Sequence, residues 1–302
     1  MKLIDIKGLT QADPYIFEHG GKYYIYSTGI DGVHCYESDA LFGEWRHVGA
    51  VLTVAGQKEF WAPAVIEHDG AFYMYYSSMP EDSYDVHLQR IKVAVSKTPT
   101  GKFEFVKDVL PPFSIDAHPV RNADGLYLFY SINRYEGGRV GTYIVCDKMI
   151  DVFTPCGAPS AVVVPTLDEE IFEHDRFKKG EHWHTIEGAC YFRIGDWHYC
   201  MYSGNCYKKD TYHIGYAVCN SKSDRLDKLV FEKHTDNGAY APLIAANASE
   251  TSTGHNTVIE CDGQLYVIYH GRAYSDNVED EPRTAHACKL FADGKLLRVE
   301  RI

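Results

Sequence analysis

Short runs of apolar and aromatic residues, separated by turns rich in Gly, Asp and Asn, make up most of the chain. Runs of this length that are enriched in Tyr, Val, Ile and Phe are typical of β-strands. The three-to-four residue periodicity of amphipathic helices is scarce. The pattern therefore predicts an all-β protein.

One strand type recurs five times, reading YYIYSTG from Tyr23, FYMYYSS from Phe72, LYLFYSI from Leu126, HYCMYSG from His198 and LYVIYHG from Leu265. A Gly-containing turn precedes each copy, and a shorter apolar strand precedes each turn, as in PYIF, PAVI, HPVR, ACYF and NTVI. Each unit thus contains a β-hairpin. A third strand follows in several units, and a fourth, such as FEFVKD or LVFEKH, usually comes next.

The repeated unit has the size of a propeller blade. The marker residues Tyr24, Tyr73, Tyr127, Tyr199 and Tyr266 are separated by 49, 54, 72 and 67 positions. Units of this length with four antiparallel strands are typical of β-propellers. A sandwich would also contain Tyr-rich strands, but it would not explain why the turn and both flanking strands recur together. We expect one five-bladed β-propeller domain over residues 1–302, with 150–185 as an insertion at the rim or an extended connection.

Polar residues stand just before the first strand of each unit. Counting back eleven or twelve positions from the marker gives Asp13, Trp61, Asp116, Glu187 and His255. In a propeller the first strand of every blade lines the central axis, so these five residues are expected in one register at one end of the channel.

Three of these five residues are carboxylic acids. Each alone has an ordinary explanation, because Asp13 before a proline and Asp116 fit turns and Glu187 fits a solvated loop. Together they would be costly to bury without a purpose. Crowded carboxylates raise one another's pKa, which can keep one protonated as an acid while another stays ionised as a base. We therefore expect Asp13, Asp116 and Glu187 to be catalytic.

The ordered segments ADPYIF, FWAPAVIEHDG, SIDAHPVRNADG, TIEGACYF and GHNTVI with YHGR resemble glycoside hydrolase family 43. The resemblance runs from about Ala12 to Arg272, and it implies a five-bladed propeller that inverts the anomeric configuration. It also implies that Asp13 is the general base, Glu187 the general acid and Asp116 the residue that tunes and orients Glu187. The IDAHP and IEGAC segments depart from the common family pattern, which leaves the substrate subclass open.

The resemblance suggests further site residues. Phe60 and Trp61 resemble an aromatic wall for a sugar ring, with core packing as the alternative. Arg272 resembles an arginine that binds sugar hydroxyls. His255 resembles an axial histidine that in some relatives binds calcium through waters or holds a structural water. No cofactor is expected to be required, and a structural calcium on the axis is the candidate metal. His182 and His184 lack a recognisable third ligand, and we interpret them as pocket or loop residues.

Charge and cysteine content bear on partners and location. Lys and Arg number 30 against 42 Asp and Glu, which gives a net charge of −12 and disfavours nucleic acid and anionic membranes as partners. The nine cysteines are odd in number and irregularly spaced, which favours a reducing compartment. The opening MKLIDIKGLT lacks the apolar stretch of a signal peptide. These features predict a cytoplasmic protein.

A cytoplasmic glycosidase would act on short imported oligosaccharides, which favours exo-action. We expect an α-L-arabinofuranosidase, with β-xylosidase or dual activity as the alternative. The chain ends at RVERI, soon after the fifth unit, and the resemblance links a further C-terminal β-sandwich to many xylosidases. A non-catalytic sugar-binding propeller would not need three axial acids. No Arg/Lys cluster accompanies the motifs as a glycoside phosphorylase would require, and neither an NDPNG-like start nor a WD repeat is present.

Overall fold

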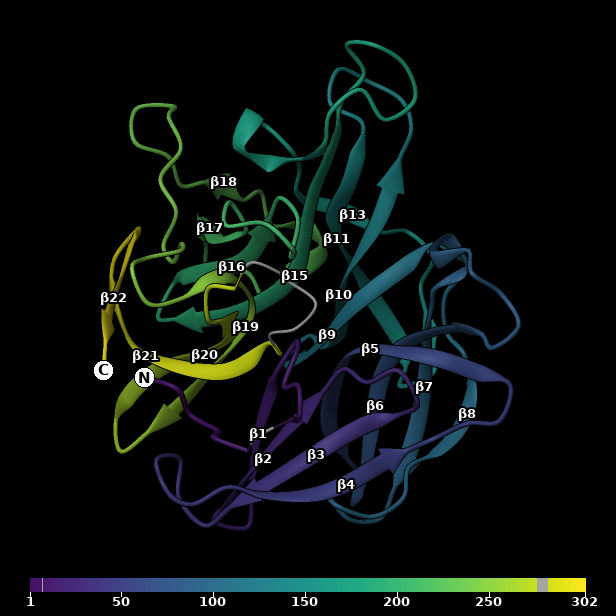
Figure 1. The fold of residues 1–302 in the computed structure, drawn as a ribbon. Coiled ribbons are helices and arrows are strands. Elements are labelled where there is room, and N and C mark those ends of the chain that lie inside the picture. The colour runs from purple at the N-terminus through teal and green to yellow at the C-terminus, as the bar shows by residue number, and fades with distance from the viewer. Residues whose placement is uncertain (7, 276–281) are drawn as a thin grey trace.

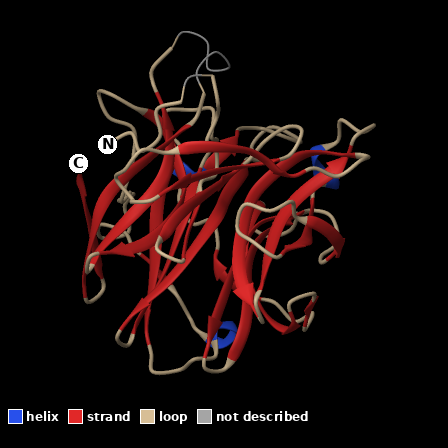
Figure 2. Cartoon of the chain, turned by 90° about the horizontal axis from the view of Figure 1, so that it is seen from below, coloured by secondary structure: helices blue, strands red, loops and turns tan. Residues whose placement is uncertain are grey.

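Strands dominate the computed structural model, which describes residues 1–6, 8–275 and 282–302 (Figure 2). Within these residues the helical segments are three short 3-10 turns, η1 (Val86–Leu88), η2 (Asp168–Glu170) and η3 (Leu226–Lys228). No described helix is long and apolar enough to span a membrane. The all-β prediction is confirmed.

The strands form five antiparallel blades (Figure 1). Blade one contains β1 (Tyr15–His19), β2 (Lys22–Ser27), β3 (Val33–Ser38) and β4 (Arg46–Leu52). Blade two contains β5 (Gln57–His68), β6 (Ala71–Pro80), β7 (Arg90–Ser96) and β8 (Glu104–Asp108). Blade five contains β19 (Thr251–Cys261), β20 (Gln264–Arg272), β21 (Thr284–Asp293) and β22 (Leu296–Arg301).

Blades three and four are joined into one ten-stranded sheet. Blade three contains β9 (Ser114–Asn122), β10 (Gly125–Arg134), β11 (Gly141–Asp151), β12 (Thr154–Pro155) and β13 (Ser160–Val163). Blade four contains β14 (Ile171–Glu173), β15 (Trp183–Ile194), β16 (Trp197–Gly204), β17 (His213–Asn220) and β18 (Glu232–Lys233). The start of β11 pairs in parallel with the start of β15, where Gly141 faces His184. A Cβ atom at Gly141 would overlap the His184 carbonyl, so this junction requires glycine.

The repeated sequence motif is the second strand of each blade, namely β2, β6, β10, β16 and β20. The first strands contact one another in a closed cycle, β1 to β5, β9, β15, β19 and back to β1. The five-bladed β-propeller predicted from the repeats is therefore confirmed. The segment 150–185 supplies the outer strand β13 of blade three, and its remainder, with η2 and β14, leads into β15.

The core consists of five apolar clusters, and each lies between two neighbouring blades. The second strands explain this division, because successive side chains of a strand point to opposite faces. In β2, for example, Tyr24 and Tyr26 pack towards blade two, whereas Ile25 packs towards blade five. The Tyr-rich repeat is thus a strand buried on both faces.

The two ends of the chain meet on blade five. Backbone hydrogen bonds join Leu3 N to Ala285 O and Ala287 N to Met1 O, beside the edge of β21 that pairs with β22. Ile4 has no exposed surface and packs in the cluster between blades five and one. The segment before β1 therefore helps to close the ring.

Replacing Ile4 with Ala should lower the free energy of unfolding by about 2–5 kcal/mol, because the substitution leaves a cavity in the closing cluster. Ile150→Ala provides a matched control, since Ile150 is 69% exposed and should change stability by less than about 0.5 kcal/mol. Urea denaturation followed by fluorescence measures both. Equal losses in the two variants would contradict this account of ring closure.

Candidate active site

One position at or just before the first strand has left-handed backbone dihedrals in all five blades, and these five residues share one register. They are Asp13 (φ 54°), Ala62 (φ 44°), Asp116 (φ 59°), Gly188 (φ 64°) and His255 (φ 45°). Each stands eleven positions before the marker Tyr of its blade. In β5, β15 and β19 the pairing register shifts at this point, as in a β-bulge.

This geometry corrects the single register that the sequence analysis assigned to five polar residues. Asp13, Asp116 and His255 occupy the left-handed position itself, whereas Trp61 and Glu187 each precede it by one residue. A bulge re-aims the side chains beside it. Gly188 is suited to its place because its φ is positive and because a Cβ there would lie 3.2 Å from His255 Nδ1.

Asp13 is surrounded by cationic and hydrogen-bonding groups. Thr28 Oγ1 donates a hydrogen bond to Asp13 Oδ2, and Arg283 Nη1 donates to Oδ1 at 3.2 Å. His270 Nδ1 lies 3.3 Å and His255 Nδ1 lies 3.5 Å from the same oxygen. Burial acts to raise the pKa of Asp13, but Arg283 and the two histidines outweigh it and hold the pKa well below its ordinary value. Asp13 is therefore ionised at neutral pH.

Glu187 has the opposite electrostatic environment. Burial and the negative charge of Asp13 raise its pKa to about 7, although a hydrogen bond from Tyr212 acts in the other direction. That bond joins Tyr212 Oη to Glu187 Oε1 at 2.9 Å. A Cβ atom at Gly254 would overlap the Tyr212 ring, so glycine in the GHN segment leaves room for this tyrosine. Glu187 can thus hold a proton near neutrality.

Asp116 interacts with the surroundings of both other carboxylates. Its Oδ2 accepts a hydrogen bond from the backbone N–H of Gly188 at 3.0 Å, which fixes the peptide next to Glu187. Burial raises the pKa of Asp116 to about 7, with His255 opposing and the charges of Glu187 and Asp13 adding to the rise. The three acids from blades one, three and four thus act on one another electrostatically.

The other predicted residues are placed as follows. Phe60 is fully buried and stacks on Tyr76 with ring centroids 5.7 Å apart, so it belongs to the core between blades one and two rather than to a sugar wall. Trp61 is half-buried, and its indole N–H donates to Glu59. Arg272 is buried and donates to Tyr207 O at 3.3 Å. The backbone N–H of His255 donates to Ser203 Oγ at 2.7 Å.

Metal binding was expected, if at all, at His255. Among the residues that the structure describes, no group of three or more His, Cys, Asp or Glu side chains is arranged to hold a metal ion. Calcium prefers a shell of six to eight oxygens, which this part of the axis would have to complete with waters. The axial calcium stays a prediction.

Four residues of the site were missed by sequence reasoning: Thr28, Tyr212, His270 and Arg283. Thr28 and His270 stand in the repeated strand copies YYIYSTG and LYVIYHG, each four positions after the marker Tyr, and that shared position could have marked them. Tyr212 and Arg283 stand in connections between strands with no recurring pattern. Arg283 also packs over the Tyr207 ring at 4.7 Å, so it joins the Asp13 site to the connection between β16 and β17.

Comparison with known proteins agrees with the fold. The family model for glycosyl hydrolases family 43 matches residues 6–294. The chain belongs to this family. It is 26% identical to the extracellular exo-α-(1→5)-L-arabinofuranosidase ArbA of Cellvibrio japonicus, across 88% of this chain and 80% of that one. An extracellular exo-α-(1→5)-L-arabinofuranosidase of Streptomyces avermitilis is 23% identical across 94% of this chain and 60% of its own length.

A solved structure of a thermostable family-43 glycoside hydrolase is similar over the whole chain. It superposes with a TM-score of 0.81 at 28% identity and covers 100% of this chain and 96% of that one. This family 43 chain is therefore a glycosidase, as the motif order predicted, and its substrates are oligosaccharides.

The prediction of a cytoplasmic location is wrong, since both of these curated relatives are named extracellular enzymes. The error has a physical reason in the cysteines. Cys35, Cys146, Cys190, Cys200 and Cys288 are buried within strands, and all nine thiols are free. A buried thiol packs as a small apolar group and is shielded from oxidation, so an irregular set of cysteines says little about the compartment. The argument for exo-action assumed imported substrates in the cytoplasm, so it no longer holds.

The raised pKa of Glu187 should appear in the pH dependence of stability. Because the folded-state pKa of about 7 exceeds the ordinary value of 4.5, folding loses free energy as pH rises through this interval. Glu187→Gln removes this loss. The unfolding free energy of the variant minus that of wild type should therefore increase by on the order of 3 kcal/mol as the pH rises from about 5 to about 8.

Denaturation at the two pH values measures the effect. Glu232→Gln serves as the matched control because this glutamate is exposed on blade four, and its difference from wild type should be the same at both pH values. A difference that is likewise constant for Glu187→Gln would contradict the protonated state assigned to Glu187.

Proposed function

We propose that this family 43 glycosidase is an inverting exo-α-L-arabinofuranosidase that releases terminal arabinofuranose from oligosaccharides. The observation that carries the proposal is the meeting of two buried carboxyls with opposite surroundings: Asp13 lies against Arg283 and His255, which lower its pKa, whereas burial raises the pKa of Glu187 to about 7. An inverting glycosidase needs one carboxylate of each kind on opposite sides of the bond that breaks.

In the proposed reaction Asp13 accepts a proton from a water molecule, and the water oxygen bonds to the anomeric carbon. The bond from that carbon to the leaving oxygen breaks, and Glu187 gives its proton to this oxygen. Both carboxyls thus exchange protonation states, and solvent restores them. Asp116 is a positioning residue, because it holds the Gly188 peptide and its charge adds to the field around Glu187.

The identity of the sugar is supported by the two relatives named exo-α-(1→5)-L-arabinofuranosidases. The same names favour an enzyme that works outside the cell. His255 and Arg272 are proposed to contact the sugar, and Trp61 is proposed to flank it, as the only one of the two predicted aromatics that retains exposed surface. β-Xylosidase activity remains the alternative within the family.

A panel of aryl glycosides and α-(1→5)-linked arabino-oligosaccharides tests the proposal with wild type and Glu187→Gln. We expect wild type to release arabinose, and the variant to lose about 10²–10⁴-fold in kcat on oligosaccharides. The loss should be smaller on p-nitrophenyl arabinofuranoside, because p-nitrophenolate leaves without needing a proton. Glu232→Gln should retain full activity.

Several results of this panel would contradict the assignment. A preference for xylosides over arabinofuranosides would show that the enzyme is a β-xylosidase. Release of internal fragments rather than single sugars would overturn exo-action. Retained configuration of the released sugar, followed by NMR, would overturn inversion. Full activity of Glu187→Gln would remove its role as the acid.

The pH profile tests Asp13 separately. Arg283 lowers the pKa of Asp13, so Arg283→Gln should raise it. A base acts only above its pKa, and the acidic limb of kcat/KM should therefore move to higher pH in this variant. Arg298→Gln is the matched control, because Arg298 is exposed on β22 and packs over Phe291. An unmoved acidic limb in Arg283→Gln would show that another group is the base.

A further inference from the structure

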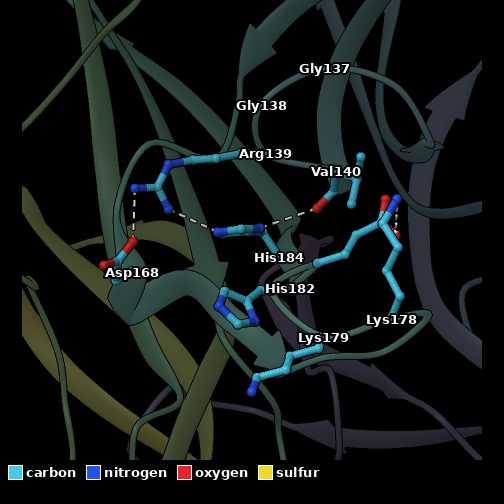
Figure 3. A pocket seen from close by; sticks show the side chains of 11 residues that line it. Gly137, Gly138, Arg139, Val140, Asp168, Lys178, Lys179, His182 and His184 are labelled. Atoms are coloured by element: carbon cyan, nitrogen blue, oxygen red, sulfur yellow. Dashed lines mark hydrogen bonds and ion pairs between the residues drawn. The ribbon is translucent and has the colours of Figure 1, made fainter.

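A charged cavity of about 500 Å³ lies at the start of β15 (Figure 3). The connection between β10 and β11 forms one wall, and residues of the 150–185 segment form the others. The side chains that matter for its chemistry are Arg139, Asp168, Lys178, Lys179, His182 and His184.

The cavity is close to the candidate active site along the chain, and hydrogen bonds link the two regions. His184 precedes Glu187 by three residues on β15, which is about 10 Å along a strand. The cavity lies towards the start of β15, the end at which Glu187 stands. The connection between β16 and β17 ties the two regions together, because Asn205 donates to Glu169 O at 2.8 Å and Lys209 donates to Phe172 O at 2.6 Å. The same connection carries Tyr212, which contacts Glu187.

The guanidinium of Arg139 is held in place within this cavity. Its Nη2 lies 2.8 Å from Asp168 Oδ1, and its Nη1 donates to His184 Nε2 at 2.8 Å. His184 Nδ1 lies 3.2 Å from the Val140 carbonyl, so Nδ1 carries the proton and Nε2 accepts. Burial lowers the pKa of His184, consistent with a neutral ring. Two of the five N–H groups of Arg139 are used, and three remain for a ligand.

The charges that line the cavity favour a ligand with a single negative charge. Arg139, Lys178 and Lys179 face two acids, Asp168 and Glu181, within a protein whose net charge is −12. Lys178 pairs loosely with Glu181 at 3.7 Å. Among the described residues that line the cavity, the two histidines are the aromatic side chains, and these residues offer no stacking platform for a neutral sugar ring.

We propose that this cavity binds the carboxylate of a uronic acid unit in the leaving-group part of the oligosaccharide, beyond the bond that is cleaved. The proposal rests on the proposed glycosidase function for its location, and on Arg139 and the two lysines for its chemistry. A guanidinium forms a matching pair of hydrogen bonds with a carboxylate. The two acids of the lining would repel the second charge of a phosphate monoester, which favours the monoanion.

The test compares two matched substrates, an arabinofuranosyl-capped oligosaccharide with one glucuronic acid unit and its methyl ester. Wild type should show a kcat/KM about tenfold higher for the acid, through a lower KM, and the preference should shrink as salt increases. The double variant Lys178→Gln/Lys179→Gln should lose the preference and keep its rate on the ester. The control Lys102→Gln/Lys107→Gln on blade two makes the same change in net charge at exposed lysines and should keep the preference.

Calorimetric binding to Glu187→Gln separates this proposal from the proposed function. Tighter binding of the acid than of the ester would support the cavity even where wild type hydrolyses neither. Equal binding of the two, or a preference for the acid that survives in the lysine double variant, would overturn it. An Arg139→Gln variant that folds and still prefers the acid would also count against it. Tighter binding of a matched phosphate monoester would overturn the choice of a carboxylate.

Discussion

An ionised carboxylate deep inside a protein needs compensation, and the ion pair of Asp13 with Arg283 supplies it. The two groups come from opposite ends of the chain and lie 3.2 Å apart, with His255 and His270 beside them. Burial alone would raise the pKa of Asp13. Burial raises the pKa of Glu187 and of Asp116, and the negative charge of the ionised Asp13 adds to both rises, so the pair with Arg283 widens the separation of the three pKa values. The ring must close for the pair to exist, which ties the site to the packing between blades five and one.

The left-handed residue eleven positions before the marker Tyr of each blade is the second constraint. Sites of backbone strain persist only where the surrounding structure enforces them, and they cluster at functional sites. Here the left-handed conformation recurs at the same position of all five blades, in four of them at a non-glycine residue, yet that residue is acidic in two blades only. In blade four glycine takes the left-handed position without strain, and the acid stands one residue earlier, with Gly188 N donating to Asp116. The acid that reaches the site is thus the left-handed residue itself in blades one and three, and the residue before it in blade four.

The segment between blades three and four shows how a regular fold acquires a further surface. Part of it completes blade three as β13, and the remainder forms the charged cavity next to the start of β15. The parallel pairing of β11 with β15 fixes the two walls of that cavity relative to Glu187. A uronic acid site there would select substrates by charge at a distance from the chemistry, while the axial acids act on the sugar alone.

The repeat, the hairpin in each unit and the number of blades could be predicted from the sequence, because strand and turn patterns are local. The three acids could be singled out in the same way, because their positions are counted along the chain from each repeat. Which other side chains surround these acids depends on how the blades pack. Nothing near Asp13 or Glu187 in sequence points to Arg283 or Tyr212, since these partners come from connections that have no repeat and meet the acids only when the blades close. It also separated Phe60, which is buried against Tyr76, from Trp61, which is not. Adjacent residues of a strand face opposite sides, so a one-residue shift at a bulge decides between core and site, and no local pattern records that shift.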